Sequence, residues 1–173
     1  IASCISVAAV DHFPPLINAD NFLRDWEFAF AAHDQPSDDR VRIVAIDEAT
    51  LHHFPYRSPI DRGMLAELLT RLDASHPRAI GVDILFDQPT EPEKDAALAR
   101  VIRTMKTPLV IAYTEEPDNV TPKQLQYLRA FVPEKDRATP DLPKDSYGIV
   151  RTIHPGMKVA DGRYLLSFER ALA

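Results

Sequence analysis

Cysteine, glycine and tryptophan are scarce in this chain. Its 173 residues include one cysteine, five glycines and one tryptophan. Because the single cysteine, Cys4, has no partner within the chain, no internal disulfide can form, and packed apolar side chains must hold the fold together. Hydrophobic residues make up 45% of the sequence, which is enough for such a core in a chain whose length suggests about one domain.

Positive charge is also in short supply. There are 20 lysines and arginines against 26 aspartates and glutamates, giving a formal net charge of -6, and no stretch gathers the basic residues. We therefore expect no nucleic-acid partner. The sequence also lacks a glycine-rich phosphate loop, a Gly-X-Ser-X-Gly elbow and a His-Glu-X-X-His pair. We accordingly expect no cofactor, and no enzyme of the classes that these motifs mark.

An uncharged apolar stretch, residues 1–10, stands at the start of the sequence without an initiating methionine. It is too short to span a bilayer, and we expect it to be the outer end of a transmembrane helix. An ordinary helix docked on the domain is one alternative. A lipoprotein cleavage box, suggested by Ile-Ala-Ser-Cys, is another. The expected organisation is a membrane segment with its linker over residues 1–19 and a single domain over residues 20–173.

Two apolar runs, residues 41–48 and 79–87, each end in acidic residues, and between them apolar side chains recur at helical spacing over residues 64–72. This pattern predicts a strand, a helix and a second strand. A third apolar run, residues 109–113, predicts another parallel strand after a second helix. Right-handed crossovers bring the carboxyl ends of parallel strands to one edge of a sheet, where α/β folds usually receive ligands.

Four charged residues follow from that geometry as candidate ligand contacts: Asp47, Arg62, Asp83 and Asp87. We expect Asp47 and Asp83 at the same sheet edge. Ser58, Pro59 and Asp61 form the start of the helix between them, with the Ser58 hydroxyl as its cap, and Arg62 in the first turn is placed to pair with either carboxylate. This pairing is also a common structural device. The carboxylates suit Ca²⁺ or Mg²⁺ as well, or the acid and base of a hydrolase, but too few ligands are visible to assign a metal.

The rest of the sequence predicts flanking elements. A helix with Phe22, Trp26, Phe30 and His33 on one face should pack on the sheet. Residues 122–131 form a helix within a surface excursion over 114–145. Residues 149–159 form an antiparallel hairpin, with a turn at Pro155-Gly156 or at Asp161-Gly162, before a last helix over 165–173. The expected fold class is α/β, with a central mixed, mainly parallel sheet, flanking helices and a C-terminal antiparallel hairpin.

Six segments occur in the order seen in the second type of CHASE domain, which the chain resembles over nearly its whole length from about Asp20. The ordered set is far more specific than any one member. The segments are Asp-Trp-Glu-Phe at 25–28, Ser-Asp-Asp-Arg-Val-Arg-Ile-Val-Ala-Ile-Asp-Glu at 37–48, Pro-Ile-Asp-Arg at 59–62, Arg-Ala-Ile-Gly-Val-Asp-Ile-Leu-Phe at 78–86, Ser-Tyr-Gly-Ile-Val-Arg at 146–151 and Ser-Phe-Glu-Arg-Ala-Leu-Ala at 167–173.

The resemblance implies the extracytoplasmic sensory domain of a bacterial inner-membrane receptor. Transmembrane helices would flank it, and a cytoplasmic output module such as a histidine kinase, a Ser/Thr kinase, a nucleotide cyclase or a cyclic-dinucleotide enzyme would follow. The expected partner is a small-molecule or protein signal, and a homodimer is compatible with this role. The alternatives are a structural dimerisation module without a small-molecule ligand and a carboxylate-dependent hydrolase.

Overall fold

The computed structural model describes residues 14–31, 38–116, 119–145, 147–159 and 161–173. The chain divides into two compact units, Ile1–Ala45 and Ile46–Ala173, here called the N-terminal unit and the C-terminal unit. The expected membrane segment, residues 1–10, lies outside the described residues. Within the described ranges, no helix has both the length and the apolarity needed to cross a bilayer.

The N-terminal unit contains one long helix, α2 (Pro14–Ala31). This element confirms the helix predicted around the aromatic face. Phe22, Trp26 and Phe30 contact one another on successive turns, with ring centroids 6.1 Å and 5.2 Å apart. Their side chains are 60%, 50% and 77% exposed, so the packing of this face on the sheet stays a prediction, and the predicted fourth member, His33, lies outside the described residues.

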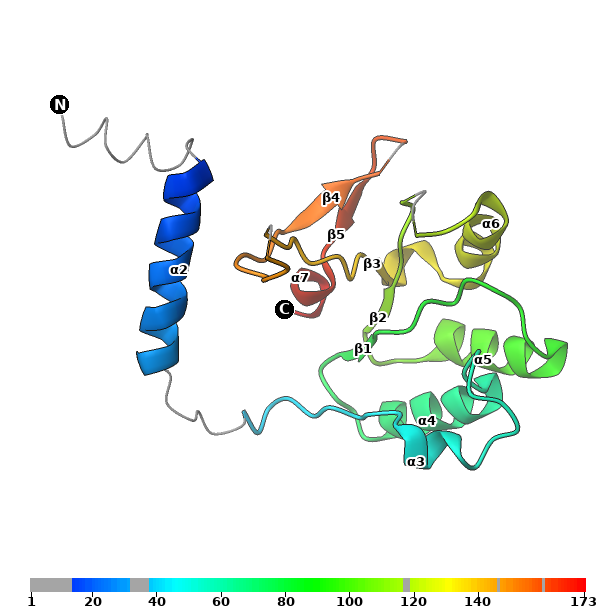
Figure 1. Ribbon diagram of the computed structural model, residues 1–173. Coiled ribbons are helices and arrows are strands. Elements are labelled where there is room, and N and C mark those ends of the chain that lie inside the picture. The colour runs from blue at the N-terminus through cyan, green and yellow to red at the C-terminus, as the bar shows by residue number, and fades with distance from the viewer. Residues whose placement is uncertain (1–13, 32–37, 117–118, 146, 160) are drawn as a thin grey trace. The chain divides into compact units, whose positions relative to one another are not determined.

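The C-terminal unit holds the sheets and the remaining helices (Figure 1). In chain order its elements are α3 (Glu48–Leu51), α4 (Arg62–Ala74), β1 (Ile80–Val82), α5 (Pro92–Thr104), β2 (Leu109–Ala112), α6 (Pro122–Phe131), the 3-10 helix η1 (Glu134–Asp136), β3 (Arg137–Ala138), β4 (Gly156–Lys158), β5 (Tyr164–Leu166) and α7 (Phe168–Leu172).

The main sheet has the order β1-β2-β3, and both neighbouring pairs are parallel. Side chains alternate between its faces. On β1, Ile80 and Val82 join the core that α4 and α5 cover, whereas a Cβ added at Gly81 would come within 2.9 Å of Leu172 in α7. Figure 1 shows α4 and α5 side by side, with α7 across the sheet from them. Glycine at position 81 therefore lets α7 approach the strand closely.

These features confirm the predicted fold class. The crossover from β1 through α5 to β2 is parallel, with Ile80 opposite Leu109, and α6 begins and ends where its pattern predicts. The antiparallel hairpin is also present as β4 and β5, and it turns at Asp161-Gly162, where Gly162 has a φ of +87°. That turn was one of the two that the sequence allowed. Left-handed backbone of this kind favours glycine.

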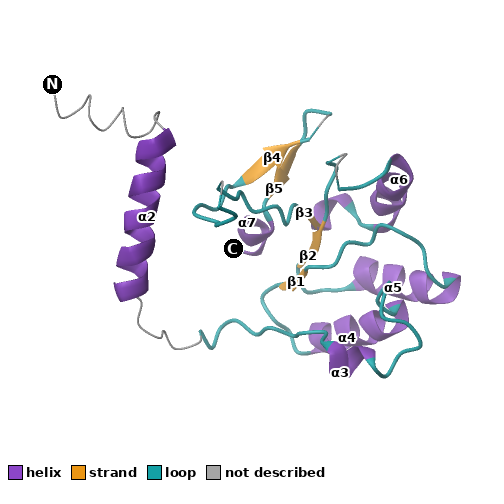
Figure 2. Ribbon diagram, viewed as in Figure 1, coloured by secondary structure: helices purple, strands orange, loops and turns teal. Residues whose placement is uncertain are grey.

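The strand predicted over residues 41–46 is wrong. Figure 2 shows this segment as a loop, and Val41, Ile43 and Val44 are 63%, 90% and 55% exposed. β-branched residues form a strand only where a neighbouring strand supplies hydrogen-bond partners. Among the described residues β1 pairs with β2 alone, so the predicted first crossover does not form.

Two further expectations need correction. The segment over 114–145 is not only a surface excursion, because it contributes β3, and Val132, Ala138 and Thr139 are fully buried. The strand predicted over 149–153 is absent: those residues make only an isolated bridge, Lys144 to Val150. The hairpin lies further along the chain, at residues 156–166.

Candidate functional site

The first turns of α4, α5 and α6 meet near the carboxyl end of β1. Asp61, which precedes α4, accepts a hydrogen bond from Lys94 in the first turn of α5, at 2.5 Å. Asp87, after β1, accepts one from Gln124 in the first turn of α6, also at 2.5 Å. In α/β folds this edge is where helix amino termini and strand carboxyl ends converge. Two of the predicted site residues, Arg62 and Asp87, lie in this region.

Arg62 is the centre of this region. It is only 1% exposed, and its guanidinium carbon lies 4.4 Å from the ring centroid of Phe86 and 5.8 Å from that of Phe131. The two rings contact each other, with centroids 5.3 Å apart. A desolvated arginine over aromatic faces gains cation–π attraction and aliphatic packing together. We call Arg62, Phe86, Asp95, Tyr127 and Phe131 the Arg62 cluster.

Asp95 in α5 is the ion-pair partner of Arg62, with Nε and Oδ1 3.7 Å apart. That Nε has no hydrogen-bond partner among the described residues, because Asp95 already accepts from the Thr90 N–H, the Thr90 hydroxyl and the Tyr127 hydroxyl. Burial lowers the pKa of Arg62, and the Asp95 carboxylate opposes that shift. Burial first, and then Asp95, raise the pKa of Tyr127 to about 12. Arg62 remains charged, and its charge is neutralised inside the cluster.

A second group of polar side chains joins α4 to α5. Lys94 Nζ lies 2.5 Å from Asp61 Oδ2 and 3.0 Å from Glu91 Oε2, and the Tyr56 hydroxyl is within 3.1 Å of Asp61 and 2.8 Å of Glu91. Asp61 also accepts the Met64 N–H, which makes it the cap of α4. Burial alone would raise the pKa of Asp61, but hydrogen bonds from Lys94, Met64 and Tyr56 lower it. The cap predicted at Ser58 is therefore wrong.

The four predicted site residues have different environments. Asp47 is exposed and caps α3 by accepting the Thr50 N–H at 2.9 Å, so it does not end a strand. Asp83 directly follows β1 and is exposed, and it forms no hydrogen bond or ion pair with another described residue. Asp87 is held by Gln124. The expected pairing of Arg62 with Asp47 or Asp83 is wrong, since its partner is Asp95.

The residues that sequence reasoning missed are the aromatic ones and Asp95. Phe86 ended a predicted strand, and Phe131 was assigned only to the apolar face of its helix. No local pattern marks an aromatic ring that will lie under a guanidinium 24 or more residues away. Asp95 carried a weak signal, because an acidic residue in a first helical turn favours a nearby cation.

A second charged group lies where the β4–β5 hairpin meets the end of β2. Arg163 donates to Asp161 at 2.7 Å, Glu134 at 2.9 Å and Glu115 at 3.1 Å. We call these four residues the hairpin clasp. Glu115 is 5% exposed and also accepts from Arg129 and the Tyr113 hydroxyl. The clasp ties the tip of the hairpin to η1 and to the segment after β2.

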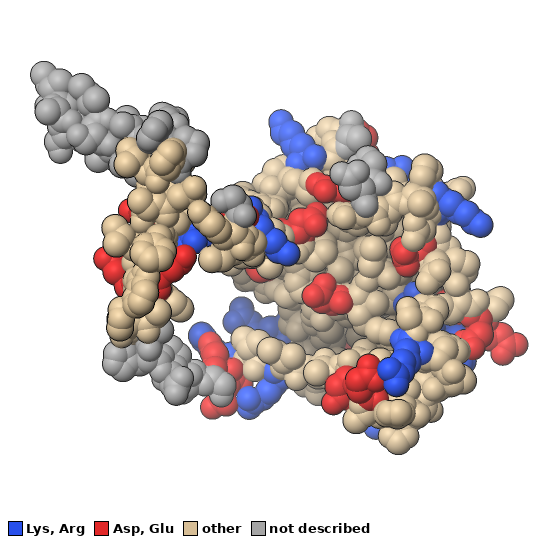
Figure 3. Space-filling view, in the orientation of Figure 1, with Lys and Arg blue, Asp and Glu red and all other residues tan. Residues whose placement is uncertain are grey.

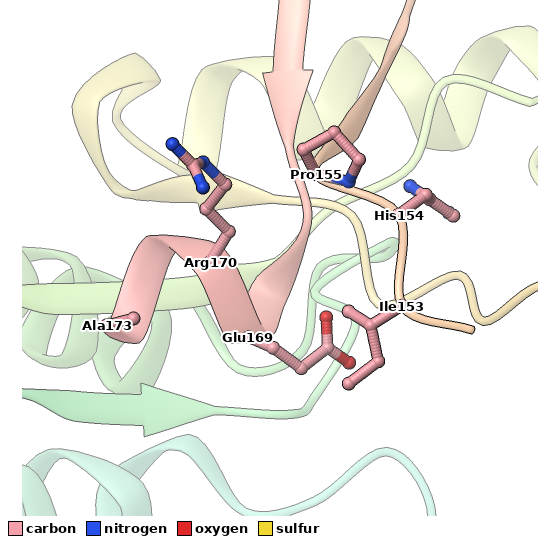
Figure 4. A pocket seen from close by; sticks show the side chains of 6 residues that line it. All are labelled: Ile153, His154, Pro155, Glu169, Arg170 and Ala173. Carbon is pink, nitrogen blue, oxygen red and sulfur yellow. The ribbon is translucent and has the colours of Figure 1, made fainter. Parts of the chain in front are cut away.

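The described part of the unit contains two hollows of ligand size. One, of about 290 Å³, lies between residues 153–155 and α7 (Figure 4). In Figure 4 the side chains of Glu169 and Arg170 leave α7 in different directions, with Glu169 turned towards Ile153. Glu169 Oε2 and His154 Nδ1 are buried atoms without a hydrogen-bond partner in the described ranges. The other hollow, of about 370 Å³, lies under the β4–β5 hairpin.

Neither charged group has the composition of a metal centre. Across the described residues, no set of three or more His, Cys, Asp or Glu side chains converges on a point where an ion could sit. Figure 3 shows acidic and basic side chains interspersed over the face in view. The Arg62 cluster is closed and internally paired, so it is suited to holding α4, α5 and α6 in register rather than to proton transfer.

The sequence comparisons give one match. A family model described as the CHASE2 domain matches residues 2–173. No curated protein and no solved structure matches the chain.

Proposed function

Because the chain belongs to the CHASE2 domain family, we propose that it is the extracytoplasmic signal-input domain of a bacterial inner-membrane receptor. The family is one of sensory extracellular domains of signalling receptors. In this proposal the domain lies in the periplasm, membrane-spanning helices flank it, and it regulates a cytoplasmic output module. That module is a histidine kinase, a Ser/Thr kinase, a nucleotide cyclase or a cyclic-dinucleotide enzyme. The family match over residues 2–173 is the observation that carries the proposal.

The proposed mechanism is a shift between two arrangements of the helices around the sheet. A small-molecule or protein signal that binds one arrangement better raises its population, and the terminal segments pass that preference on. The Arg62 cluster gives this mechanism a fixed frame, because one buried side chain contacts residues from α5, α6 and the segment after β1 and holds them together. Of the proposed ligand contacts, Asp47 and Asp83 are exposed, Asp87 is half-buried and held by Gln124, and Arg62 is buried in its cluster.

A dimerisation module without a small-molecule ligand is the second candidate. It is favoured by α2, where Phe22, Phe28 and Phe30 are 60%, 76% and 77% exposed. Such a module would form a dimer whose stability is the same with and without periplasmic extracts. The hydrolase alternative receives no comparable support, because Asp47 and Asp83 do not end neighbouring strands.

The proposed periplasmic location of the domain is tested by cysteine labelling of the receptor in its native membrane. Asp83→Cys is placed in a Cys4→Ser background, since Asp83 is exposed and has no partner in the described chain. A membrane-impermeant maleimide should label this cysteine in intact spheroplasts. A cysteine placed in the output module is the control and should react only after lysis. Labelling of position 83 only after lysis would place the domain in the cytosol and overturn the proposal.

The sensory role is tested through the output activity of the same receptor. Deleting residues 46–173 in frame should change that activity or abolish its response to periplasmic conditions. Arg62→Met, which removes the buried charge, should shift the basal activity, whereas Arg100→Met on the exposed side of α5 should not. Unchanged output in the deletion under every condition would show that the domain does not sense.

A further inference from the structure

The hollow under the β4–β5 hairpin is larger than the one beside α7, and residues from three parts of the chain line it. Tyr113 and Glu115 line it from the end of β2, Arg137 from β3, and Leu165 from the hairpin. Its volume of about 370 Å³ falls within the range of small-molecule sites, roughly 300 to 1,000 Å³. None of these residues belongs to the Arg62 cluster. The cavity is therefore a site separate from the one that the sequence predicted.

The hairpin covers this cavity and is attached at both of its ends. At its base the Thr139 N–H donates to the Leu166 carbonyl at 2.9 Å, and the Phe168 N–H donates to the Thr139 carbonyl at 2.8 Å. At its tip the hairpin clasp joins Arg163 to Glu115 and Glu134. The base consists of backbone hydrogen bonds, while the tip depends on side-chain ion pairs that are partly exposed. The tip is thus the end that can open.

Most of the charged side chains that line the cavity are paired with one another or with a neighbour. Glu115 and Glu134 carry two negative charges, and Lys135, Arg137 and Arg163 carry three positive charges. Both glutamates are engaged by arginines, and Lys135 is paired with Asp136. Arg137 is the exception among the described residues that line the cavity, because it forms no ion pair with any of them. The cavity therefore has a cation to offer to an anionic ligand.

Arg137 is held in place by neutral groups, whose partial charges stabilise the guanidinium without supplying a formal negative charge. Its Nε and Nη2 donate to the carbonyls of Val132 and Arg129 at the end of α6, at 2.7 to 3.0 Å. Its guanidinium carbon lies 4.7 Å from the ring centroid of Tyr113, which is 1% exposed. These contacts fix the guanidinium plane, and Nη1 makes no hydrogen bond to a described residue. An ordered guanidinium with free donors is suited to a carboxylate.

The hairpin also lines the cavity with apolar side chains. Val159 and Leu165 are two of them, beside Tyr164. Apolar side chains together with one cation that has no ion-pair partner match a ligand with one acidic group and a short hydrocarbon or aromatic part. We propose that this cavity binds a small organic monocarboxylate, with its carboxylate at Arg137 and its apolar part against Val159 and Leu165. This inference deepens the proposed sensory function. The binding itself does not depend on that function, but the statement that the ligand is a signal rests on it.

Binding at this place has a direct mechanical route to α7. The hairpin runs through Ser167, which caps α7 by accepting the Arg170 N–H at 3.3 Å, into a helix that packs on β1 and β2. A ligand that separates Val159 from Arg137 moves the hairpin relative to the sheet. Because α7 follows without a linker, the strain reaches α7 through Ser167 and the backbone hydrogen bonds that join the hairpin base to Thr139. The ligand thereby favours one position of the last helix.

The site is tested by titration calorimetry on the 173-residue chain with four probes: acetate, butyrate, benzoate and phenylacetate. At least one should bind, with benzoate or phenylacetate tighter than acetate because apolar side chains of the hairpin line the cavity. Benzamide and benzyl alcohol, which keep the ring without the charge, should bind at least ten-fold more weakly than benzoate. No binding by any of the four carboxylates, or equal binding of benzoate and benzamide, would overturn the proposal.

Two variants locate the binding in the cavity. Arg137→Gln should weaken the carboxylate affinity at least ten-fold, whereas Arg103→Gln, an exposed arginine on α5, should leave it unchanged. Should Arg137→Gln not fold, Val159→Trp fills the cavity from the hairpin side without changing charge and should abolish binding. Full affinity in either folded variant would place the carboxylate elsewhere and refute the site.

The failure of this site is distinguishable from failure of the sensory function. Carboxylate binding to the chain together with unchanged output in the domain deletion would leave the site standing and overturn the sensory role. Loss of regulation in the deletion together with no carboxylate binding would do the reverse.

Discussion

The Arg62 cluster and the hairpin clasp both place an arginine among carboxylates, but they do so in opposite surroundings. The Arg62 side chain is 2% exposed and packs on two phenylalanine rings, with one carboxylate 3.7 Å away. The Arg163 side chain is 41% exposed and makes three ion pairs at 2.7 to 3.1 Å. The clasp has shorter contacts, but water and salt reach it. Contact length alone therefore does not indicate how much each contributes to stability.

The comparison also separates two roles. A buried cation on aromatic rings fixes helices that must not move independently, because any opening would leave the charge without a partner. An exposed clasp at the tip of a hairpin can open at little cost and close again. In a receiver of signals the first arrangement suits the scaffold, and the second suits the part that responds.

The largest loss of stability should come from disrupting the Arg62 cluster. Arg62→Ala should lower the free energy of unfolding by about 3 kcal/mol, because it leaves a cavity over Phe86 and removes the cation beside Asp95. Arg62→Met retains most of the volume and separates packing from charge. Urea denaturation followed by far-UV circular dichroism measures both, since the only tryptophan, Trp26, lies in the N-terminal unit.

Arg100→Ala is the matched control for that measurement, because Arg100 is exposed on α5 and should change stability by no more than about 0.5 kcal/mol. Equal stability of the Arg62→Ala and Arg100→Ala variants would mean that the buried cluster does not hold the helices together.

A smaller loss should follow from breaking the clasp at its buried member. Glu115→Gln should cost about 2 kcal/mol, since the carboxylate is 5% exposed and accepts from Tyr113, Arg129 and Arg163. Glu116→Gln is the control at the next position, where the side chain makes no contact of this kind with a described residue. Hydrogen exchange should show faster exchange in β4 and β5 and unchanged exchange in α4. Faster exchange in α4 instead would refute the separation of the two sites.

The parts of this architecture that sequence predicted are those set by local chemistry. The helix over Pro122–Phe131 has a proline at its start and a capping box between Thr121 and Gln124, both of which are legible in the sequence. The run Leu109–Ala112 is buried along its whole length, which a continuous apolar segment indicates. The start of α4 was predicted less exactly, because Asp61 and not Ser58 caps the helix and Pro59 lies before its first turn.

The parts of the architecture that the sequence did not predict depend on long-range contacts. β3 is only two residues long, and no sequence pattern marks Arg137 as a strand residue. It belongs to a strand because β2 pairs with it. Residues 41–46 have the composition of a strand, but the described backbone forms a loop there. The partner of Arg62 could not be chosen between Asp47, Asp83 and Asp95 without knowing that α5 lies against α4. The hydrophobic pattern predicts which segments form helices and strands, whereas the pairing of charges depends on how those helices and strands pack together.

The two sites should also differ in their response to acid. Burial alone would raise the pKa of Glu115, but hydrogen bonds from Arg129 and Tyr113 outweigh it and lower the pKa below the ordinary 4.5. A carboxyl with a lowered folded-state pKa contributes stability above its unfolded pKa, and that stability is lost as pH falls through the folded value. The free energy of unfolding should therefore decrease as the pH falls below about 4.5. Denaturation midpoints from about pH 7 to about pH 3 measure this loss.

Two variants assign that acid response. Glu115→Gln should remove part of the acid response. Arg62→Met should retain it, because the guanidinium that this variant lacks does not titrate in this pH range and so does not cause the response. A full acid response in Glu115→Gln would assign it to other carboxylates, such as Asp61, whose pKa is also lowered.

The smallest expected effect is the dependence on salt. Arg163→Gln removes three ion pairs whose cation is 41% exposed, so its destabilisation should be modest at low ionic strength. At about 1 M salt the Debye length is about 3 Å, and most of that difference from wild type should disappear. The destabilisation by Arg62→Ala should be nearly the same at both salt concentrations, because the burial of Arg62 excludes counter-ions. Urea midpoints of the three proteins in low and high NaCl give both comparisons. A salt-dependent loss in Arg62→Ala would show that ions reach the buried guanidinium, and the contrast between the cluster and the clasp would not hold.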